Sequence, residues 1–471
     1  MRNRDGKAGI TIIILAAIIL IALVPWYFIV YGNLKPDDNE KADLPDVQSA
    51  SEASLPVEET PPVSEPISPD LPAPENESES GEVVSNEDRI VDISIEYMEL
   101  ADELYEVASS HNAVAVSLAA YDGKTGEYFI YNYGHADVSQ GRFVDNNTKF
   151  RVASLSKLVT VICAMVLVDE GLINLDSDIS DYLGYEVVNP NFPEAIITTR
   201  MLMQHTSTIY DSGTFQTARD RNSADTPQSL LESGSSFRRS QPGTLFEYTN
   251  FGYSVLGAVC ENVSGKTLDT LARDVLFDPI GIDAAYVPSK LRSSENIAVI
   301  YNDRHAATRS VQSQLETEES GVPGLDLHLA QGNLTIRMID YAKILAMLGN
   351  GGTLRDVRVL SSDAVRAIHV TDVEGVAYRQ GLATRYTFGD FMPEKGFYWH
   401  TGSAYGTYAQ YIYGTAGNTN RGVVAVTTGA TTGREPNGMV SLCTKLSALV
   451  WEDLRFSNEN DMLYEDTENE S

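Results

Sequence analysis

A serine and a lysine stand three residues apart at the front of a strongly apolar stretch. Residues 149–172 read KFRVASLSKLVTVICAMVLVDEGL, and the run from Leu158 to Leu167 is typical of a helix buried on most of its faces. Ser154 could simply cap this helix, but the usual partner three residues on is Glu or Gln. Lys157 instead places a cation where the helix dipole disfavours one. The pair therefore predicts a serine nucleophile activated by a buried amine.

Two further stretches carry polar groups suited to the same reaction. Tyr248 and Asn250 stand in QPGTLFEYTNFGYSVLG, and His400, Thr401 and Gly402 stand in YWHTGSAYGTYAQ. Taken alone, the first is equally consistent with a turn before a helix, and the second with a strand edge carrying one partly exposed histidine. The motifs S-x-x-K, Y-x-N and H-T-G follow one another in this order along the chain, and their combination indicates a catalytic site.

The elements expected around these motifs define the fold class. Residues 90–110 predict an amphipathic helix, and AVAVSLAAYDGKTGEYFIYNYG predicts two strands joined by a turn at residues 122–126. Helical periodicity dominates from about 200 to 380, strands return in FYWHTG, TYAQYIYG and GVVAVTTGA, and a last helix is expected at about 437–454. We expect an α/β (α+β) fold: a central antiparallel sheet formed by both ends of the catalytic domain, flanked by helices, with an inserted mainly helical region.

The N-terminal 35 residues predict a short cytoplasmic tail and a transmembrane anchor. The apolar stretch 8–31 is long enough to cross a bilayer, and aromatic residues lie at its far end. A cleaved signal peptide is the alternative, but the stretch is long and no small-x-small site follows it. Basic residues precede the stretch and acidic ones follow it, which indicates a single-pass protein of the cell membrane with its N-terminus inside and its catalytic domain outside.

The remaining ends of the chain are acidic. Residues 36–88 contain nine prolines, sixteen acidic residues and one lysine, and predict a disordered tether; residues 457–471 predict an acidic disordered tail. Between them, residues 89–456 form the expected folded domain, which carries all three motifs. The tether and the tail carry about −15 and −6 of the net charge of −32, so the domain itself is only mildly acidic. This balance argues against nucleic acid as a partner.

Cysteines and histidines give no sign of a metal site. The three cysteines, at 163, 260 and 443, lie in apolar contexts without metal-like spacing and are expected to be core thiols. Six histidines are widely dispersed and are expected to be surface or packing residues: His111, His135, His205, His305, His328 and His369. We expect neither a metal nor a cofactor.

With these motifs in order, the chain from about 95 to 455 resembles the serine β-lactamase and penicillin-binding protein superfamily, in its class C β-lactamase and DD-peptidase-like branch. Further stretches are similar to that family, among them FRVASLSKLVTV, LMQHTSTI, LFDPIGI and LGNGGTLRDVRVLS. The resemblance implies that Ser154 attacks a carbonyl to form an acyl-enzyme. It implies that Lys157 helps to deprotonate Ser154, and that Tyr248 passes the proton to the leaving group.

The same resemblance implies the binding residues. Asn250 would contact Lys157 and the acyl-side amide of the substrate, and the backbone N–H groups of Ser154 and Ser403 would hold the oxyanion. Gly402 would leave room for the substrate along the strand, and Thr401 would offer its hydroxyl to a carboxylate. The chain departs from class C β-lactamases at His400, where those enzymes carry lysine. A histidine is mostly neutral at pH 7, which favours peptide or ester chemistry over β-lactam hydrolysis.

Three functions stay open on the sequence alone. The first is a membrane-anchored cell-wall peptidase of the D-Ala type, such as a carboxypeptidase or a penicillin-binding protein-like enzyme, lifted toward peptidoglycan by the tether. The second is an esterase, a D-aminopeptidase or a β-lactamase, and the third is a non-catalytic binding protein. The expected partners are accordingly a small peptide, ester or β-lactam substrate, with peptidoglycan among the candidates, and the membrane through the N-terminal helix.

Overall fold

The computed structural model describes residues 88–454, except 221–223, 375–376, 390–391 and 415–419. The expected anchor (1–35), the tether (36–88, apart from its last residue) and the acidic tail (457–471) lie outside the described residues. Among the residues that are described, no helix combines the length and the hydropathy that a membrane crossing needs.

One sheet of ten described strands joins the two ends of the domain. Its order is β1-β3-β2-β16-β15-β14-β13-β12-β11, with β4 beside β3, and every pair is antiparallel except β1 with β3. The strands are β1 (Arg89–Asp92), β2 (Ala115–Asp122), β3 (Glu127–Asp137), β4 (Arg142–Phe143), β11 (Val373–Glu374), β12 (Arg379–Gln380), β13 (Arg385–Gly389), β14 (Met392–Ala404), β15 (Thr407–Gly414) and β16 (Arg421–Thr428). The predicted sheet, built from both ends of the domain, is confirmed.

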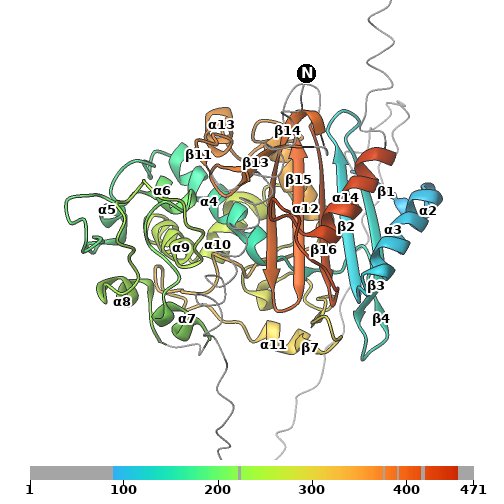
Figure 1. Ribbon diagram of the computed structural model, residues 1–471, viewed down its shortest axis with the longest axis horizontal. Helices are drawn as coiled ribbons and strands as arrows, with labels where there is room; N and C mark the ends of the chain where they lie inside the picture. Colours follow the sequence, from blue (N-terminus) through green and yellow to red (C-terminus); the bar gives the residue numbers. More distant parts are fainter. Residues whose placement is uncertain (1–87, 221–223, 375–376, 390–391, 415–419, 455–471) are drawn as a thin grey trace, which may run out of the picture. The chain divides into compact units, whose positions relative to one another are not determined.

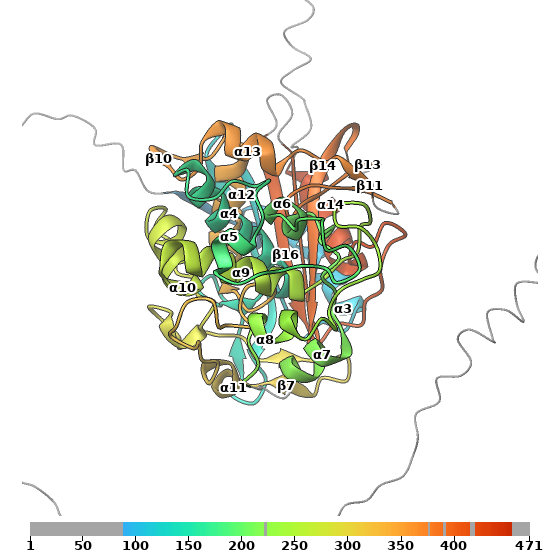
Figure 2. The same ribbon diagram turned by 90° about the vertical axis from the view of Figure 1, so that its left-hand side faces the viewer.

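The sheet is covered by helices on both faces (Figure 1). Helices α3 and α14 cover one face, and α12 packs on the other beside the inserted helical region, which lies in front of the sheet in Figure 2. The helices are α2 (Ile93–Glu96), α3 (Met98–Ser110), α4 (Ser156–Asp169), α5 (Ser180–Leu183), α6 (Thr199–Met203), α7 (Gly213–Asp220), α8 (Pro227–Glu232), α9 (Phe251–Ser264), α10 (Leu268–Ala272), α11 (Val311–Leu315), α12 (Met338–Gly349), α13 (Ser362–Ile368) and α14 (Ser441–Asp453).

Short elements complete the described chain. Single helical turns are η1 (Ala153–Leu155) and η3 (Pro288–Lys290), and η2 (Arg273–Phe277) is a π-helical turn that continues α10. Three small antiparallel pairs join β5 (Phe150–Arg151) to β8 (Thr335–Ile336), β6 (Ile300–Tyr301) to β7 (Ala307–Arg309), and β9 (Thr353–Leu354) to β10 (Val357–Arg358).

The expected helix over 90–110 is wrong at its start. Residues 89–92 form β1, which pairs in parallel with β3, and the helical part is divided between α2 and α3. Asp92 ends the strand and caps α2, because its carboxylate accepts the backbone N–H of Ser94 at 2.9 Å. The pairing partner lies some forty residues away in the sequence, which a local hydrophobic pattern does not reveal.

Strand β2 divides the hydrophobic core into two layers. Its side chains alternate: Ala119 and Tyr121 belong to the large core that includes α4, α9 and α12, whereas Val116 and Leu118 face the smaller core under α3 and α14. All eight residues of β2 are therefore buried. The three cysteines are buried and free, as expected of core thiols.

Helix α4 occupies the middle of the large core. Every residue from Ser156 to Leu167 is buried, which confirms the interpretation of the apolar run as a helix enclosed on most sides. Its packing against α9 brings the S-x-x-K and Y-x-N motifs together, because Asn250 immediately precedes α9.

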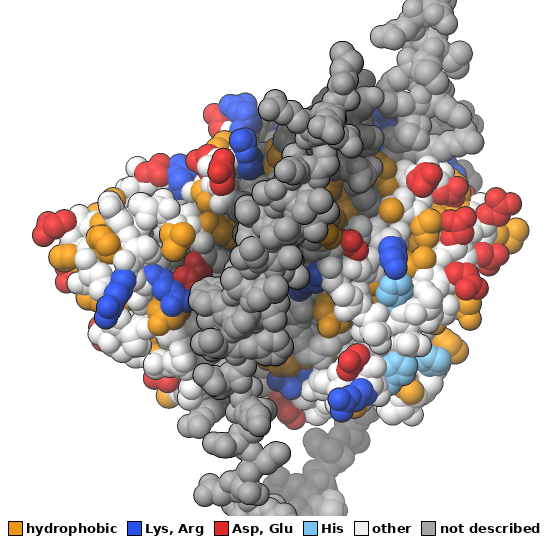
Figure 3. Space-filling model, in the orientation of Figure 1, with side chains coloured by type: hydrophobic (Ala, Val, Ile, Leu, Met, Phe, Trp, Pro, Cys, Tyr) orange, Lys and Arg blue, Asp and Glu red, His pale blue; other side chains and the backbone are white. Residues whose placement is uncertain are grey.

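The exposed surface of the domain matches the charge analysis. Acidic side chains gather over α2 and α3 (Figure 3), where Glu99, Asp102, Glu103 and Glu106 are exposed. Such a surface repels phosphate backbones, and the absence of a nucleic-acid partner stays a prediction.

Candidate active site

Ser154 lies in a tight turn immediately before α4. It occupies the 3₁₀ turn η1, and no serine side chain caps α4, so the capping alternative is wrong. The preceding residue, Ala153, has φ = 48°, a left-handed conformation that costs a non-glycine residue about 1–2 kcal/mol. Ser156 holds this turn: its hydroxyl donates to the Ala153 carbonyl at 2.6 Å and accepts the N–H of Leu334 at 2.9 Å. The fold thus holds the residue before the nucleophile in a strained conformation.

Lys157 is completely buried beneath Ser154. Its Nζ donates to three oxygens: Ser154 Oγ at 3.3 Å, Asn250 Oδ1 at 2.9 Å and the Gln331 carbonyl at 2.7 Å. No acidic side chain forms an ion pair with Lys157 in the part of the chain that the structure describes. The amine therefore has a proton path to the serine hydroxyl and no carboxylate to compete for it.

Asn250 is oriented by Asp211, a residue outside the three motifs. The Asp211 carboxylate accepts the Asn250 side-chain amide at 2.8 Å and the backbone N–H groups of Asn250 and Phe251 at 2.7 and 2.8 Å. A carboxylate only accepts, so the Asn250 amide must turn its oxygen toward Lys157. Asp211 also supplies the cap that α9 lacks, because Asn250 does not cap that helix itself.

Tyr248 stands beside Lys157 with its hydroxyl unengaged. The Lys157 Nζ lies 5.0 Å from the centroid of the Tyr248 ring, and His205 packs on the ring at 4.5 Å between centroids. The Tyr248 hydroxyl makes no hydrogen bond to any described residue. This arrangement holds the ring firmly and leaves the phenol oxygen for a substrate.

His400 is a neutral, buried residue. Its Nδ1 lies 2.8 Å from the Thr401 carbonyl, which can only accept, so Nδ1 carries the proton and Nε2 does not. Nε2 is buried and has no partner among the described residues. Burial, followed by the charges of Arg385 and Lys157, holds the pKa of His400 well below its usual value. The sequence analysis expected no permanent charge at position 400, and the burial of His400 favours its neutral form further.

Arg385 supplies a cation near Tyr248 from the neighbouring strand. Its guanidinium carbon lies 5.7 Å from the Tyr248 ring centroid, 4.5 Å from that of Tyr378 and 5.1 Å from that of Trp399. The side chain is only 9% exposed and forms no ion pair with an acidic side chain among the described residues. The positive charge that His400 does not provide thus comes from β13 instead of β14.

Thr401 and Ser403 project from the same side of β14, because alternate residues of a strand share a face. The exposed guanidinium of Arg434 donates to Thr401 Oγ1 at 3.4 Å. Ser403 lines, together with Ser154, a cavity of about 280 Å³. This face of the strand therefore presents the Thr401 hydroxyl, bound by the Arg434 guanidinium, and Ser403, which shares the cavity of Ser154.

Gly402 has a structural role in addition to the one expected. A Cβ at this position would lie 2.3 Å from the Val152 carbonyl oxygen and 3.3 Å from the Ala153 Cβ. Glycine is therefore needed for the close approach of β14 to the nucleophile turn, a structural reason that the sequence did not reveal, and its role in making room for substrate stays a prediction. The approach brings Ser403 to the same cavity as Ser154.

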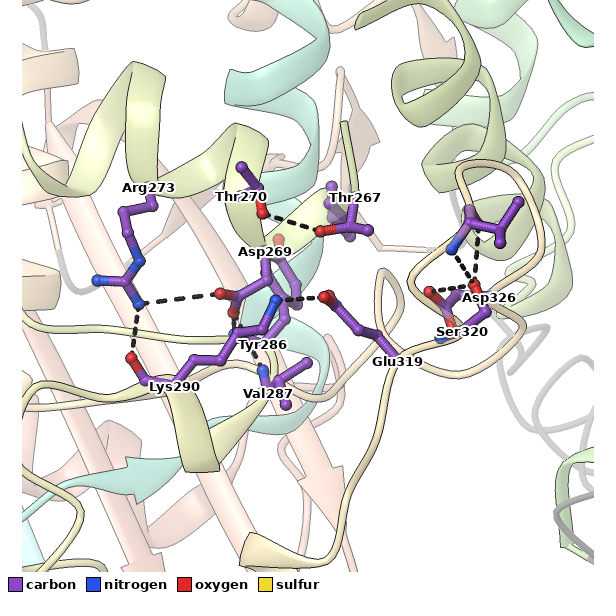
Figure 4. Close-up of polar contacts among 12 residues, drawn as sticks. Thr267, Asp269, Thr270, Arg273, Tyr286, Val287, Lys290, Glu319, Ser320 and Asp326 are labelled. Carbon is purple, nitrogen blue, oxygen red and sulfur yellow. Dashed lines mark hydrogen bonds and ion pairs between the residues drawn. The ribbon is translucent and has the colours of Figure 1, made fainter. Parts of the chain in front are cut away.

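The segment that supplies the Gln331 carbonyl is anchored by a polar network (Figure 4). Glu319 forms an ion pair with Lys290, and the Asp326 carboxylate accepts the backbone N–H of Ser320 at 3.0 Å. Between these two residues in the sequence, the N–H of Gly324 donates to the buried Glu261 of α9 at 2.8 Å. These bonds fix the backbone that leads to the site wall, so Lys157 meets a preformed acceptor.

Comparison with known proteins decides the family. A family model described as beta-lactamase matches residues 101–440, well over half of the chain. The chain belongs to the beta-lactamase family. The predicted membership in a beta-lactamase-related family of serine hydrolases is therefore confirmed.

Individual relatives of this beta-lactamase family member are distant. It is 26% identical over 219 residues to penicillin-binding protein 4* of Bacillus subtilis, a match covering 45% of this chain and 47% of the relative. The chain thus spans less than half the length of the curated relatives it matches. It shares its fold with a class C beta-lactamase from Rhodobacter sphaeroides (TM-score 0.58, 18% identity, covering 75% of this chain and 99% of that one) and with an octameric penicillin-binding protein homologue from Pyrococcus abyssi (TM-score 0.58, 18% identity, 76% and 77%).

The structure brings all eight predicted site residues of this beta-lactamase family member into one region and adds several that the sequence analysis missed. His205 and His328 were expected to be surface or packing residues; His205 does pack, but against Tyr248, and His328 lines the cavity beside Ser154. Asp211 follows the LMQHTSTI stretch by two residues, which was the available signal for it. Arg385 and Arg434 carried no sequence signal.

Exchanging Asp211 for asparagine tests its positioning role in this beta-lactamase family member. The new amide would face the Asn250 amide donor to donor, so Asn250 would turn its oxygen away from Lys157. We expect kcat/KM to fall about 10–100-fold, which corresponds to one charge-assisted hydrogen bond of about 1.5–3 kcal/mol. The measurement is steady-state hydrolysis of an activated ester, with exposed Asp356→Asn as the matched control. Unchanged kinetics in Asp211→Asn would contradict the role.

The buried histidines of this beta-lactamase family member predict acid sensitivity. Burial is the largest cause that holds the pKa of both His205 and His400 well below the usual value, so the unfolded chain binds protons below pH 6.5 that the folded chain does not. These two histidines should not reduce the free energy of unfolding above about pH 6.5. Below that pH the free energy of unfolding should fall by up to about 1.4 kcal/mol per pH unit for each histidine. Urea unfolding between pH 5 and 7.5 measures this slope, and His400→Asn should reduce it. An equal slope in both proteins would contradict the assignment.

Proposed function

We propose that the protein is a D-Ala-type peptidase that acts through an acyl-enzyme on Ser154. The observation that carries the proposal is the pair formed by Thr401 Oγ1 and Arg434 on the strand face that also bears Ser403. A peptide ending in D-Ala presents a carboxylate one residue beyond its scissile carbonyl. A hydroxyl and a guanidinium beside the nucleophile suit that carboxylate.

The proposed reaction uses the site as it stands. Lys157 takes the Ser154 proton as Oγ attacks the carbonyl carbon, while the N–H groups of Ser154 and Ser403 hold the oxyanion. Tyr248 passes its phenol proton to the leaving nitrogen as the C–N bond breaks, which releases the C-terminal amino acid, and takes the proton held by Lys157 in return. Water then attacks the ester and restores the Ser154 hydroxyl. Asn250 holds Lys157 in place throughout and contacts the acyl-side amide.

The proposal extends to the site of action. We propose that residues 8–31 anchor the protein in the cell membrane, with the N-terminus inside, and that the acidic tether of residues 36–88 carries the domain outward to the cell wall. The basic residues before the apolar stretch and the acidic residues after it support this orientation.

Mass spectrometry with benzylpenicillin is the first test. A persistent adduct on the domain of residues 89–456 that is absent in Ser154→Ala would support a penicillin-reactive peptidase. An absent adduct with consumed antibiotic would mean a β-lactamase, and an absent adduct with intact antibiotic would contradict the peptidase proposal.

A peptide pair tests the carboxylate contact. An acyl-D-Ala-D-Ala peptide should be cleaved about 10–100-fold faster than its C-terminal amide, since each charge-assisted hydrogen bond contributes about 1.5–3 kcal/mol. Arg434→Gln should remove most of this preference, whereas the exposed control Arg366→Gln should retain it. Equal rates for the acid and the amide would contradict the assignment.

The neutral His400 favours one second candidate. An esterase or D-aminopeptidase needs no cation at this position, because its substrates need not end in a carboxylate. Hydrolysis of short acyl esters without any cleavage of D-Ala-D-Ala peptides would favour this candidate.

A further inference from the structure

The cavity beside Ser154 has a second wall that the mechanism above does not use. Its volume is about 280 Å³, and its lining includes Ser154 and Asn250, so it begins at the nucleophile on the acyl side of the site. The rest of the wall comes from β5, α7, the segment before β8 and the turn between β14 and β15. None of the described residues that line it is acidic.

Arg151 contributes a cation without an acidic partner to this wall. Its Nε donates to the Gly332 carbonyl at 3.0 Å, and no acidic side chain forms an ion pair with it among the described residues. Burial, opposed by Tyr405 and assisted by Arg309, lowers the pKa of Arg151 to about 10, so the group stays charged at neutral pH. A guanidinium that bonds to a carbonyl and to Tyr405 but to no acidic side chain among the described residues is suited to an anion that enters from outside.

His328 and Arg219 converge on the same wall. Both line the cavity, and after burial, the nearby charges of Arg219 and Arg151 lower the pKa of His328. His328 Nδ1 is buried and has no hydrogen-bond partner among the described residues. An unpaired ring nitrogen beside two guanidinium groups costs free energy unless a ligand reaches it.

Tyr405 closes this wall in a strained conformation. It forms a two-residue turn with Gly406, and both have positive φ, 58° and 104°. Tyrosine is unusual at such a position, where asparagine or glycine is favoured. Its ring lies 5.1 Å from the guanidinium carbon of Arg151 and 3.9 Å from that of Arg309. The turn places an aromatic ring against the cations at the mouth of the cavity.

We infer that this cavity binds a carboxylate carried by the acyl half of the substrate, held by Arg151, Arg219 and His328. The inference rests on the proposed function, since it assigns a specificity to the acyl-enzyme formed on Ser154. A basic cavity in a chain of net charge −32 is a local feature and not a consequence of composition. The guanidinium groups match a carboxylate in geometry as well as in charge.

Two esters of equal length test this specificity. The 4-nitrophenyl monoester of adipic acid carries a free carboxylate on its acyl half, and 4-nitrophenyl methyl adipate is its neutral counterpart. Since each charge-assisted hydrogen bond contributes about 1.5–3 kcal/mol, the wild-type kcat/KM should be about 10–100-fold higher for the monoester. Rates are taken above those of Ser154→Ala.

Three variants test which residues cause the preference for the monoester. Arg219→Gln and Arg151→Lys should each reduce the ratio between the two esters at least fivefold, the second by removing the planar fork while keeping the charge. Arg239→Gln, an exposed arginine outside the cavity lining, should leave the ratio unchanged. A wild-type ratio near one, or a ratio that survives in both cavity variants, would overturn the inference alone. No hydrolysis of either ester above Ser154→Ala would overturn the proposed acyl-enzyme and the inference with it.

Discussion

Replacing Lys157 by methionine should reduce the rate of Ser154 acylation by about 10³-fold or more, because the serine hydroxyl loses the base beside it. The Lys157 Nζ is the only amine within hydrogen-bond distance of Ser154 Oγ among the described residues. Methionine has a similar volume and fills the same buried space without taking a proton. The measurement is burst kinetics with an activated ester.

Stability separates this effect from misfolding. Lys157→Met leaves the Asn250 and Gln331 oxygens without their donor, which costs about 1–3 kcal/mol for each buried group, and it removes a buried amine that is itself costly to desolvate. We therefore expect a folded protein. Lys343→Met on α12, which loses an ion pair with Asp88, is the matched control and should retain the acylation rate. A folded Lys157→Met protein with a normal burst would refute the proposed base.

Replacing Tyr248 by phenylalanine should lower acylation about 10²–10⁴-fold, the usual contribution of a general acid or base. The substitution removes only the hydroxyl, which bonds to no described residue, and keeps the ring packed on His205. The free energy of unfolding should therefore stay within about 0.5 kcal/mol of the wild type. Steady-state kinetics and urea unfolding measure both quantities.

Tyr253→Phe provides the opposite control. Its ring lies 5.2 Å from Lys157 Nζ, almost as close as that of Tyr248, but its hydroxyl is buried and donates to the Met203 carbonyl at 3.0 Å. Its loss should cost about 0.5–1.5 kcal/mol of stability, the usual net contribution of one hydrogen bond, with little effect on acylation. If the two variants behaved alike, proximity to Lys157 and not the free phenol oxygen of Tyr248 would explain the loss.

The sequence predicted the motif residues and the long strands well, for identifiable physical reasons. Strands β2, β3, β15 and β16 are long, apolar and bounded by turn residues, and each was expected close to where it lies. Ser154, Lys157, Tyr248 and Asn250 are recognisable because their residue types perform the chemistry themselves. Where the local sequence pattern and the structure agree in this way, a single sequence is enough to predict the element or the site residue.

What the sequence did not reveal depends on contacts between distant parts of the chain. Asp211 is an ordinary aspartate until α9 is placed against it, and Arg385 becomes relevant only because β13 pairs with β14. Three of the four residues of β1, 90–92, were assigned to a helix because the parallel pairing of β1 with β3 is not visible in the local sequence. His328 was dismissed for its isolation in the sequence, although the fold brings it to Arg151.

The pairing of β2 with β16 also shapes how the protein folds. The hydroxyl of Thr427 donates to the Ala115 carbonyl at 2.9 Å across 312 residues of chain, in the middle of the sheet. Closing so long a loop makes folding slow, because the chain loses conformational entropy before the stabilising contacts between the two strands form. A nascent chain that ends before β16 leaves the buried edges of β2 and β15 without a partner, and such edges aggregate. Productive folding therefore depends on completion of the chain.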